Sequence, residues 1–396
     1  MNVQTRTPVP TQPDLGTAPV PAAPYYDPGY YELEQRAVFM KSWLNIGHVC
    51  ELPDSGSFIR RDLEFAKASL LIVRGKDGEV RAFHNACTHR GTQVEPAACG
   101  KKATFSCPYH RWTYGTDGKL LSAPDFERFH ADKADLALKQ VATEVCAGLI
   151  FVNLDPRPEQ SLREYLGPTA DMLEAMPVAK ATTFTEYVYD IDANWKLTYD
   201  NFQENYHLRF IHSRTVGPGV GPDNPFGYPT ETAFFGEHRT QTIWTNPDPS
   251  GDIKPSQMLP FSRAGARAHA DGILVHPHAR DYLALFPNLF LLGSPTQHFL
   301  HTVFPLSANR SRGVIRLYWV GEDETASVRY AREYVMATVR DVHSEDRGVI
   351  EAGQRGLESG ALSHIHFQEQ EVLCRHLYAM VDARVEAMKD KLGAAE

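Results

Sequence analysis

The stretch Asn-Ala-Cys-Thr-His-Arg-Gly at residues 85–91, followed by Cys-Pro-Tyr-His-Arg-Trp-Thr-Tyr at residues 107–114, decides the fold of this chain. Each stretch offers one cysteine and one histidine, and seventeen residues separate the two pairs. Thiolates and imidazoles are side chains that bind zinc, copper and iron. Because each of the two short loops carries one cysteine and one histidine, the sequence predicts a metal centre held between the loops.

Two kinds of metal centre use two cysteines and two histidines. A Rieske-type [2Fe–2S] cluster has two thiolates on one iron and two imidazoles on the other, which raises its reduction potential. A structural zinc ion also binds Cys₂His₂ sets, but zinc fingers usually present a cysteine pair and then a histidine pair. The alternating order found here favours the cluster, with zinc as the alternative and a chance grouping of core residues as the least favoured interpretation.

The residues around these loops predict short antiparallel strands. Residues 69–74 are apolar and β-branched, Lys76-Asp-Gly78 is typical of a hairpin turn, and residues 79–83 supply the returning strand. Thr116-Asp-Gly118 indicates a second hairpin. We therefore expect a small antiparallel β domain that carries the two metal-binding loops.

A second informative stretch runs from Asn194 to His212 and has helical composition without internal Gly or Pro. Glu204 and His207 are three residues apart and would share a helix face. His207 and His212 are five apart, about 140° on an ideal helix, so a shared metal requires the helix to bulge or end between them. Two histidines and one carboxylate form the facial triad of non-heme Fe(II) oxygenases. Taken alone, such histidines are more often ordinary core or surface residues.

Together, the two stretches resemble the corresponding segments of the Rieske non-heme iron oxygenases. The resemblance implies that Cys87 and Cys107 bind one iron of a [2Fe–2S] cluster and that His89 and His110 bind the other. It covers nearly the whole chain from about residue 28 onward.

The same resemblance assigns roles to the second stretch. His207 and His212 would bind a mononuclear catalytic Fe(II), and Glu204 would be a bridging carboxylate. In this family the bridge contacts a cluster histidine of a neighbouring subunit, matched here to His110. Electrons would pass from His110 across Glu204 to His207, so the resemblance implies a homotrimer or a multiple of one. Many members have Asp at the bridge, and Glu204 is a variant within the pattern.

The third iron ligand is expected from residues 344–357, which resemble the family's helix with an Asp five residues before a Glu and eight before a Gln. Asp346 fits this register, and its helical face also carries Ile350 and Leu357, which would point it inward. Glu345 is the nearest rival. Asp323 reads as part of an exposed turn.

The expected fold class is α+β, with an all-β Rieske domain followed by a helix-grip (START-like) catalytic domain with a curved antiparallel sheet. The expected divisions are a Pro-rich flexible N-terminus (1–27), an N-terminal helix that packs on the catalytic domain (28–45), the Rieske domain (46–155) and the catalytic iron domain (156–396). Segment 213–282, rich in Gly and Pro, is interpreted as a loop over the substrate entrance.

Composition excludes several classes of function. The net charge of −9 argues against a nucleic-acid partner, and no apolar run approaches the roughly 18 residues of a membrane span. Two of the six cysteines belong to the predicted cluster and the other four are scattered, and no secretory signal is visible, which favours a cytoplasmic location. No Gly-x-Gly-x₂-Gly motif suited to NAD or flavin is evident, so electrons would come from a separate reductase, directly or through a ferredoxin.

The sequence thus predicts a terminal oxygenase that uses O₂ to hydroxylate a small organic substrate. Abundant Phe and Tyr favour an aromatic or other bulky apolar substrate, as in aromatic hydrocarbon catabolism. The alternative is a monooxygenase or demethylase of a quaternary ammonium compound such as carnitine or betaine, since a Glu bridge also occurs in such relatives. A pure Rieske electron carrier would not need His207 and His212, and a ligand-binding module would not need a redox centre.

Overall fold

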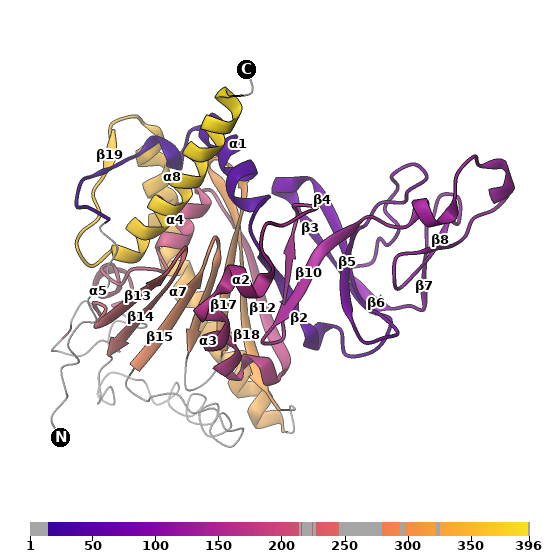
Figure 1. Cartoon of the computed structure of the whole chain (residues 1–396). Helices are drawn as coiled ribbons and strands as arrows, with labels where there is room; N and C mark the ends of the chain where they lie inside the picture. Colours follow the sequence, from indigo (N-terminus) through magenta and orange to yellow (C-terminus); the bar gives the residue numbers. More distant parts are fainter. Residues whose placement is uncertain are drawn as a thin grey trace. The chain divides into compact units, whose positions relative to one another are not determined.

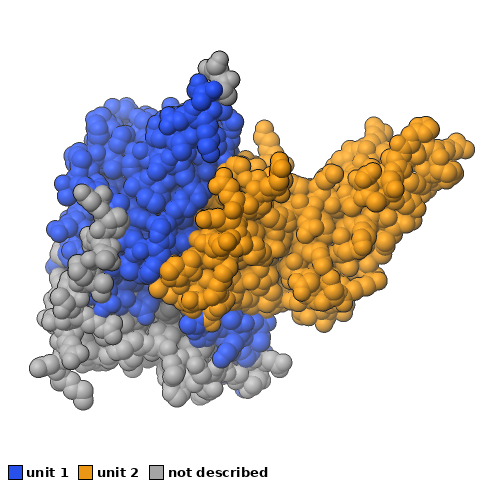
Figure 2. Space-filling view, viewed as in Figure 1, with its two compact units in different colours: residues 1–38, 175–396 blue, residues 39–174 orange. Residues whose placement is uncertain are grey.

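The computed structural model of the chain describes residues 15–213, 215, 224, 227–244, 279–293, 298–321 and 325–394 (Figure 1). Most of segment 213–282, where we predict a loop over the substrate entrance, lies outside these residues, as does Asp323. Contacts divide the chain into two compact units, residues 39–174 and residues 1–38 with 175–396 (Figure 2). The first unit is therefore an insertion in the second.

The unit at residues 39–174 is built almost entirely of antiparallel strands. A seven-stranded sheet has the order β2-β11-β10-β5-β4-β3-β6, and a three-stranded sheet has the order β7-β8-β9. The strands are β2 (Leu44–His48), β3 (Ser57–Leu63), β4 (Ala68–Arg74), β5 (Val80–His84), β6 (Cys99–Lys101), β7 (Thr104–Ser106), β8 (Thr113–Gly115), β9 (Leu120–Ser122), β10 (Gln140–Cys146) and β11 (Leu149–Asn153). Two short helices follow, α2 (Leu162–Leu166) and α3 (Pro168–Ala175).

Both predicted hairpins are confirmed. Strands β4 and β5 pair from Leu70↔His84 to Arg74↔Val80 around the predicted turn, in which Gly78 has φ +86°. Strands β8 and β9 pair around Gly118, which has φ +79°. Glycine suits both positions because side chains disfavour positive φ.

The second unit is built on a seven-stranded antiparallel sheet with the order β12-β18-β17-β16-β15-β14-β13 (Figure 1). Its strands are β12 (Ala181–Ile191), β13 (Glu231–Phe235), β14 (His238–Trp244), β15 (Ala279–Leu285), β16 (Leu289–Gly293), β17 (His298–Ser307) and β18 (Arg310–Val320). Strands β17 and β18 are joined by a tight turn, because Ser307 already pairs with Arg310. The expected α+β class with an antiparallel catalytic sheet is thus observed.

Helices pack on this sheet and around its ends. They are α1 (Pro28–Glu34), α4 (Trp195–Asp200), α5 (Leu208–Ile211), α7 (Ala326–Glu358) and α8 (Val372–Gly393). Helix α7 contacts β12, and α4 contacts β17 and β18. A two-residue ladder joins β1 (Val20–Pro21) to β19 (His364–Ile365). None of the described helices has the length and hydropathy of a membrane span.

The N-terminal helix α1 is anchored in the core of this second unit. Glu34 and Lys196 are both fully buried and form an ion pair, with Lys196 Nζ donating to Glu34 Oε1 at 2.5 Å. The indole of Trp195 donates to the other oxygen of Glu34 at 2.7 Å. Breaking such a pair from one side costs about 3–5 kcal/mol, because the remaining charge is buried alone. Helix α1 therefore belongs to the same compact unit as residues 175–396.

The stretch from Asn194 to His212 is not the continuous helix that its composition suggests. Helix α4 ends at Asp200, and α5 is a single turn with His207 at its N-cap and His212 at its C-cap. Between them, Glu204 Oε2 accepts hydrogen bonds from the backbone amides of Tyr206 at 2.5 Å and His207 at 3.3 Å. Such local side-chain bonds compete with helical ones.

Candidate metal centres

The two Cys/His loops share one backbone conformation. In each, the amide four residues after the cysteine donates to the cysteine carbonyl: Gly91 to Cys87 at 2.8 Å and Arg111 to Cys107 at 3.0 Å. Gly91 and Arg111 both have positive φ, +80° and +61°. That conformation costs a residue with a side chain on the order of 1 kcal/mol, which the surrounding loop must offset at Arg111. The two halves of the predicted centre are thus built alike.

The loops bring the two predicted cysteine ligands into one core cluster and the two predicted histidine ligands close to each other. Cys87 and Cys107 are buried in one core cluster. Burial raises the pKa of the Cys107 thiol, and the nearby Cys87 sulfur acts in the same direction. The rings of His89 and His110 lie 4.7 Å apart between centroids. A pair of buried thiols and a pair of neighbouring imidazoles are the donors that a Rieske cluster requires, because a cationic iron favours the ionised form of a buried thiol.

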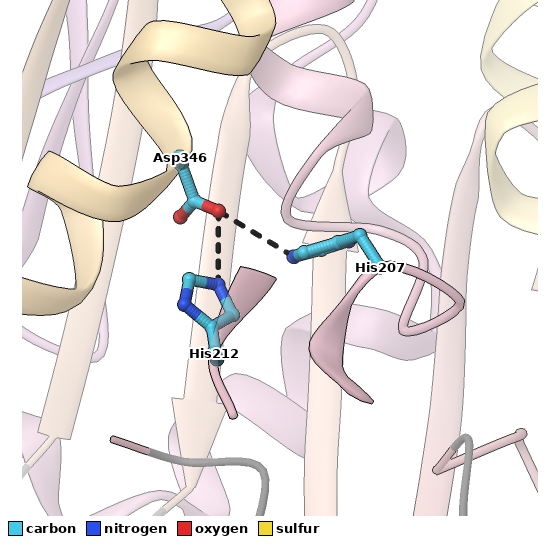
Figure 3. A group of neighbouring side chains, drawn as sticks. All are labelled: His207, His212 and Asp346. Atoms are coloured by element: carbon cyan, nitrogen blue, oxygen red, sulfur yellow. Dashed lines mark ion pairs between the residues drawn. The ribbon is translucent and has the colours of Figure 1, made fainter. Parts of the chain in front are cut away.

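The second candidate centre joins α5 to helix α7. His207, His212 and Asp346 point toward one another (Figure 3), and one ligand atom from each lies within 4.8 Å of the others. Asp346 Oδ1 is 2.9 Å from His212 Nε2 and 3.6 Å from His207 Nε2. The five-residue spacing is accommodated because the helical turn ends at His212. Sequence reasoning therefore named three residues that the fold brings to one point.

The donor set fits a divalent metal. Asp346 is buried, and no hydrogen bond within the described part of the chain reaches its Oδ1, despite the close approach of His212. A buried polar atom without a hydrogen bond calls for an explanation such as an ion. Burial acts to lower the pKa of His212, but the carboxylates of Asp346 and Glu345 together outweigh it and raise this pKa above its usual value. A cation at this point would neutralise the acidic surroundings.

Glu345, the rival for the third ligand, contacts the other side of the same histidine. Its Oε2 lies 2.7 Å from His212 Nδ1 and accepts a hydrogen bond from Thr215 Oγ1 at 2.6 Å. A carboxylate on the outer nitrogen of a metal-binding histidine fixes its tautomer and orientation. Sequence spacing could not have separated Asp346 from Glu345 in this way, because the distinction depends on which side of His212 each one meets.

Glu204 contacts the outer nitrogen of the other histidine. Its Oε1 lies against His207 Nδ1, opposite the nitrogen that faces Asp346. The predicted bridging carboxylate is therefore in direct contact with a predicted iron ligand.

Comparison with known proteins identifies both halves of the chain. Residues 42–142 match the model of the Rieske [2Fe-2S] domain, and residues 178–387 match the ring hydroxylating alpha subunit (catalytic domain). The predicted boundary at 155/156 falls between these matches and stays a prediction.

Full-length relatives include monooxygenase and dioxygenase subunits. The chain is 28% identical to the glycine betaine monooxygenase oxygenase subunit of Chromohalobacter salexigens, over 87% of this chain and 81% of that protein. It is 30% identical to the carnitine monooxygenase oxygenase subunit of Escherichia coli, over 86% and 84%. It is also 30% identical to the 2-aminobenzenesulfonate 2,3-dioxygenase subunit alpha of Alcaligenes sp, over 78% and 77%.

Solved structures share the fold. The quaternary ammonium Rieske monooxygenase CntA has a TM-score of 0.76 at 23% identity and covers 95% of this chain and 99% of its own. Naphthalene 1,2-dioxygenase from Rhodococcus sp. has a TM-score of 0.71 at 22% identity and covers 93% and 94%. These likenesses extend over both units.

Proposed function

The chain belongs to the Rieske-type ring-hydroxylating oxygenase alpha subunits, and we propose that it is a terminal oxygenase that hydroxylates an aromatic or other bulky apolar substrate with O₂. The cofactors of this enzyme class are a Rieske [2Fe–2S] cluster and a mononuclear non-heme iron. The observation that carries the proposal is the convergence of His207, His212 and Asp346 on one point, where a buried carboxylate oxygen accepts no hydrogen bond from the described residues.

We propose that Cys87, His89, Cys107 and His110 hold the cluster and that His207, His212 and Asp346 hold the iron. When bound, the cluster supplies single electrons and the iron activates O₂. The side chains of this chain position both groups. Glu345 keeps the Nδ1 proton on His212 so that Nε2 faces Asp346, and Glu204 does the same for His207.

We propose that Glu204 also carries the electron route to His110 of a neighbouring subunit. Large apolar side chains beside both ends of this route are exposed in the single chain: Tyr109 by 55%, Tyr206 by 46% and Phe210 by 62%. Such exposure is typical of a surface that a partner covers. A homotrimer, with a separate reductase or ferredoxin as electron donor, fits this arrangement. Sedimentation of the intact chain tests it, and a monomer at micromolar concentration would oppose it.

The substrate class is inferred from a cluster of three aromatic rings, two on the large sheet and one in the segment between α4 and His207. Phe202, Phe290 and Phe299 contact one another with centroid separations of 6.2–6.4 Å. They offer apolar surface next to the loop that leads to His207. A quaternary ammonium substrate is the second candidate, because the glycine betaine and carnitine enzymes are relatives and because aromatic faces also attract cations.

The ferrous protein treated with nitric oxide tests the proposal. Nitric oxide replaces O₂ at an open iron position, and the EPR spectrum of the complex reports the iron's surroundings. We expect a ferrous–nitrosyl signal that aromatic compounds reshape and quaternary ammonium compounds do not. The signal should be absent in His207→Ala and Asp346→Ala, while the cluster signal persists. A full nitrosyl signal in both variants would refute the assigned ligands, and reshaping by glycine betaine would favour the second candidate.

A further inference from the structure

Tyr189 and His301 form a buried hydrogen-bonded pair on the large sheet. Tyr189 Oη lies 2.7 Å from His301 Nε2, and both residues are buried. They belong to β12 and β17, which flank β18, where Gly313 is the cross-strand partner of Tyr189. A Cβ at position 313 would collide with the phenol of Tyr189. The glycine thus leaves the space in which the Tyr189 ring crosses β18 and reaches His301.

The hydrogen bond from Tyr189 fixes which nitrogen of His301 carries the proton. Burial raises the pKa of Tyr189 well above its usual value, so the phenol keeps its hydrogen. Nε2 of His301 is the hydrogen-bond partner found for this phenol among the described residues, so donation to Nε2 is the arrangement that uses the phenol hydrogen, and it places the imidazole proton on Nδ1. Nδ1 is buried and has no hydrogen-bond partner among the residues that the structure describes. A buried N–H that donates to nothing is costly and indicates a ligand or water at that place.

This N–H lies in the aromatic surroundings of the candidate iron site. The ring of Phe202, five residues before His207, lies 4.1 Å from the His301 ring between centroids. The ring of His343 lies 3.7 Å from the ring of Tyr189 between centroids. His343 is one helical turn before Asp346 on α7. The Tyr189–His301 pair is therefore flanked by residues of both segments that supply the candidate iron ligands.

The imidazoles near this place are uncharged at neutral pH. Burial, with a smaller effect of His343, lowers the pKa of His301 well below its usual value. Burial lowers the pKa of His343 to about 4. Among the described residues, two charged groups act electrostatically on both Tyr189 and His343. Asp346 already faces the two iron-site histidines, and Arg347 is paired with Glu351 at 3.0 Å. Because each of these two charges already has a partner within the described part of the chain, a charged ligand would gain little here, whereas a neutral hydrogen-bond acceptor would satisfy His301.

We propose that His301 Nδ1 is a specificity-determining donor that binds the oxygen of a neutral aromatic substrate, such as an aryl ketone or aldehyde, with Tyr189 as its positioning residue. The aromatic part of the substrate lies against Phe202 and its neighbours, and the oxygen meets His301. This inference rests on the proposed function and narrows its substrate class from apolar aromatic compounds to oxygen-bearing ones.

The test measures binding by calorimetry to the intact holoenzyme, with O₂ excluded so that no ligand is consumed. Acetophenone and α-methylstyrene are matched probes, because they differ in a carbonyl oxygen against a methylene group. We expect the dissociation constant of acetophenone to be about tenfold lower than that of α-methylstyrene, because one net hydrogen bond changes affinity by about that factor. Glycine betaine should bind more weakly than either.

Variants assign the preference to one nitrogen. His301→Leu should bind both probes equally, whereas His301→Asn, which keeps a side-chain N–H near the position of Nδ1, should retain part of the preference. Tyr189→Phe should reduce it, since the tautomer is no longer fixed. His298→Leu is the matched control: His298 is buried on the same strand and, by strand alternation, faces the opposite side. Melting temperature and the cluster's EPR signal report folding of each variant.

Equal binding of the two probes to the wild type, no binding of either, or an unchanged preference in a folded His301→Leu variant would each overturn the inference. The nitrosyl spectrum separates this failure from failure of the proposed function. An intact nitrosyl signal with no carbonyl preference refutes only the His301 site. Loss of the nitrosyl signal with the preference retained refutes the oxygenase proposal instead.

Discussion

Removal of Glu345 is the sharpest test of how the iron site is held. In the structure its carboxylate meets His212 Nδ1 at 2.7 Å, while Nε2 of the same ring faces Asp346. The variant Glu345→Ala deletes a hydrogen bond to a charged acceptor, which is worth about 1.5–3 kcal/mol. If that energy holds His212 in its metal-binding tautomer, iron affinity should fall by about 10–100-fold.

The assay is competition for Fe(II) with a calibrated chelator under anaerobic conditions, with the EPR signal of the Rieske cluster as internal standard. Glu345→Gln keeps an acceptor oxygen and should lose less than about tenfold. Glu351→Ala is the matched control, because Glu351 lies on the same helix and pairs at 3.0 Å with the exposed Arg347. An Fe(II) affinity of Glu345→Ala equal to that of this control would refute the reasoning.

Three further predictions follow from other parts of the structure. Burial raises the pKa of Asp200 to about 7, above its value in the unfolded chain, so its ionisation lowers stability as pH rises from about 4 to about 7. Asp200→Asn should flatten this decline, and its stability advantage over the wild type should be about 3 kcal/mol larger at about pH 8 than at about pH 5 in melting experiments. Gly313→Ala should destabilise the fold by about 1–3 kcal/mol, because the methyl group collides with Tyr189; calorimetric unfolding checks it, and an unchanged melting temperature would contradict the collision. Cys107→Ser should abolish the Rieske EPR signal and leave the nitrosyl signal of the second site, so joint loss of both signals would indicate misfolding rather than loss of one ligand.

Local sequence signals predicted the parts of the fold that depend on local chemistry. The Asp-Gly pair ending at Gly78 predicted a hairpin, because the turn needs positive φ at a residue without a side chain. Asp346 was predicted to point inward from the apolar residues on its helical face, and it is buried.

The sequence could not predict features that depend on distant residues. Helical composition around Glu204 suggested one continuous helix, but the carboxylate binds backbone amides that a helix would have used. The Tyr189–His301 pair involves three strands whose order is set by the whole sheet, so no spacing in the sequence indicates it. Likewise, only the folded chain shows that Glu345 and Asp346 meet opposite nitrogens of one ring.

The buried pair of Glu34 and Lys196 has a consequence for synthesis on the ribosome. The two residues are 162 positions apart, and the whole inserted unit of residues 39–174 is translated between them. At about 5–20 residues per second, Glu34 waits on the order of ten to thirty seconds for its partner. The Rieske unit is complete at residue 174, before Lys196 is made, whereas α1 still lacks the buried partner of Glu34 at that point. Helix α1 can therefore reach its buried position only after the whole inserted unit has been made.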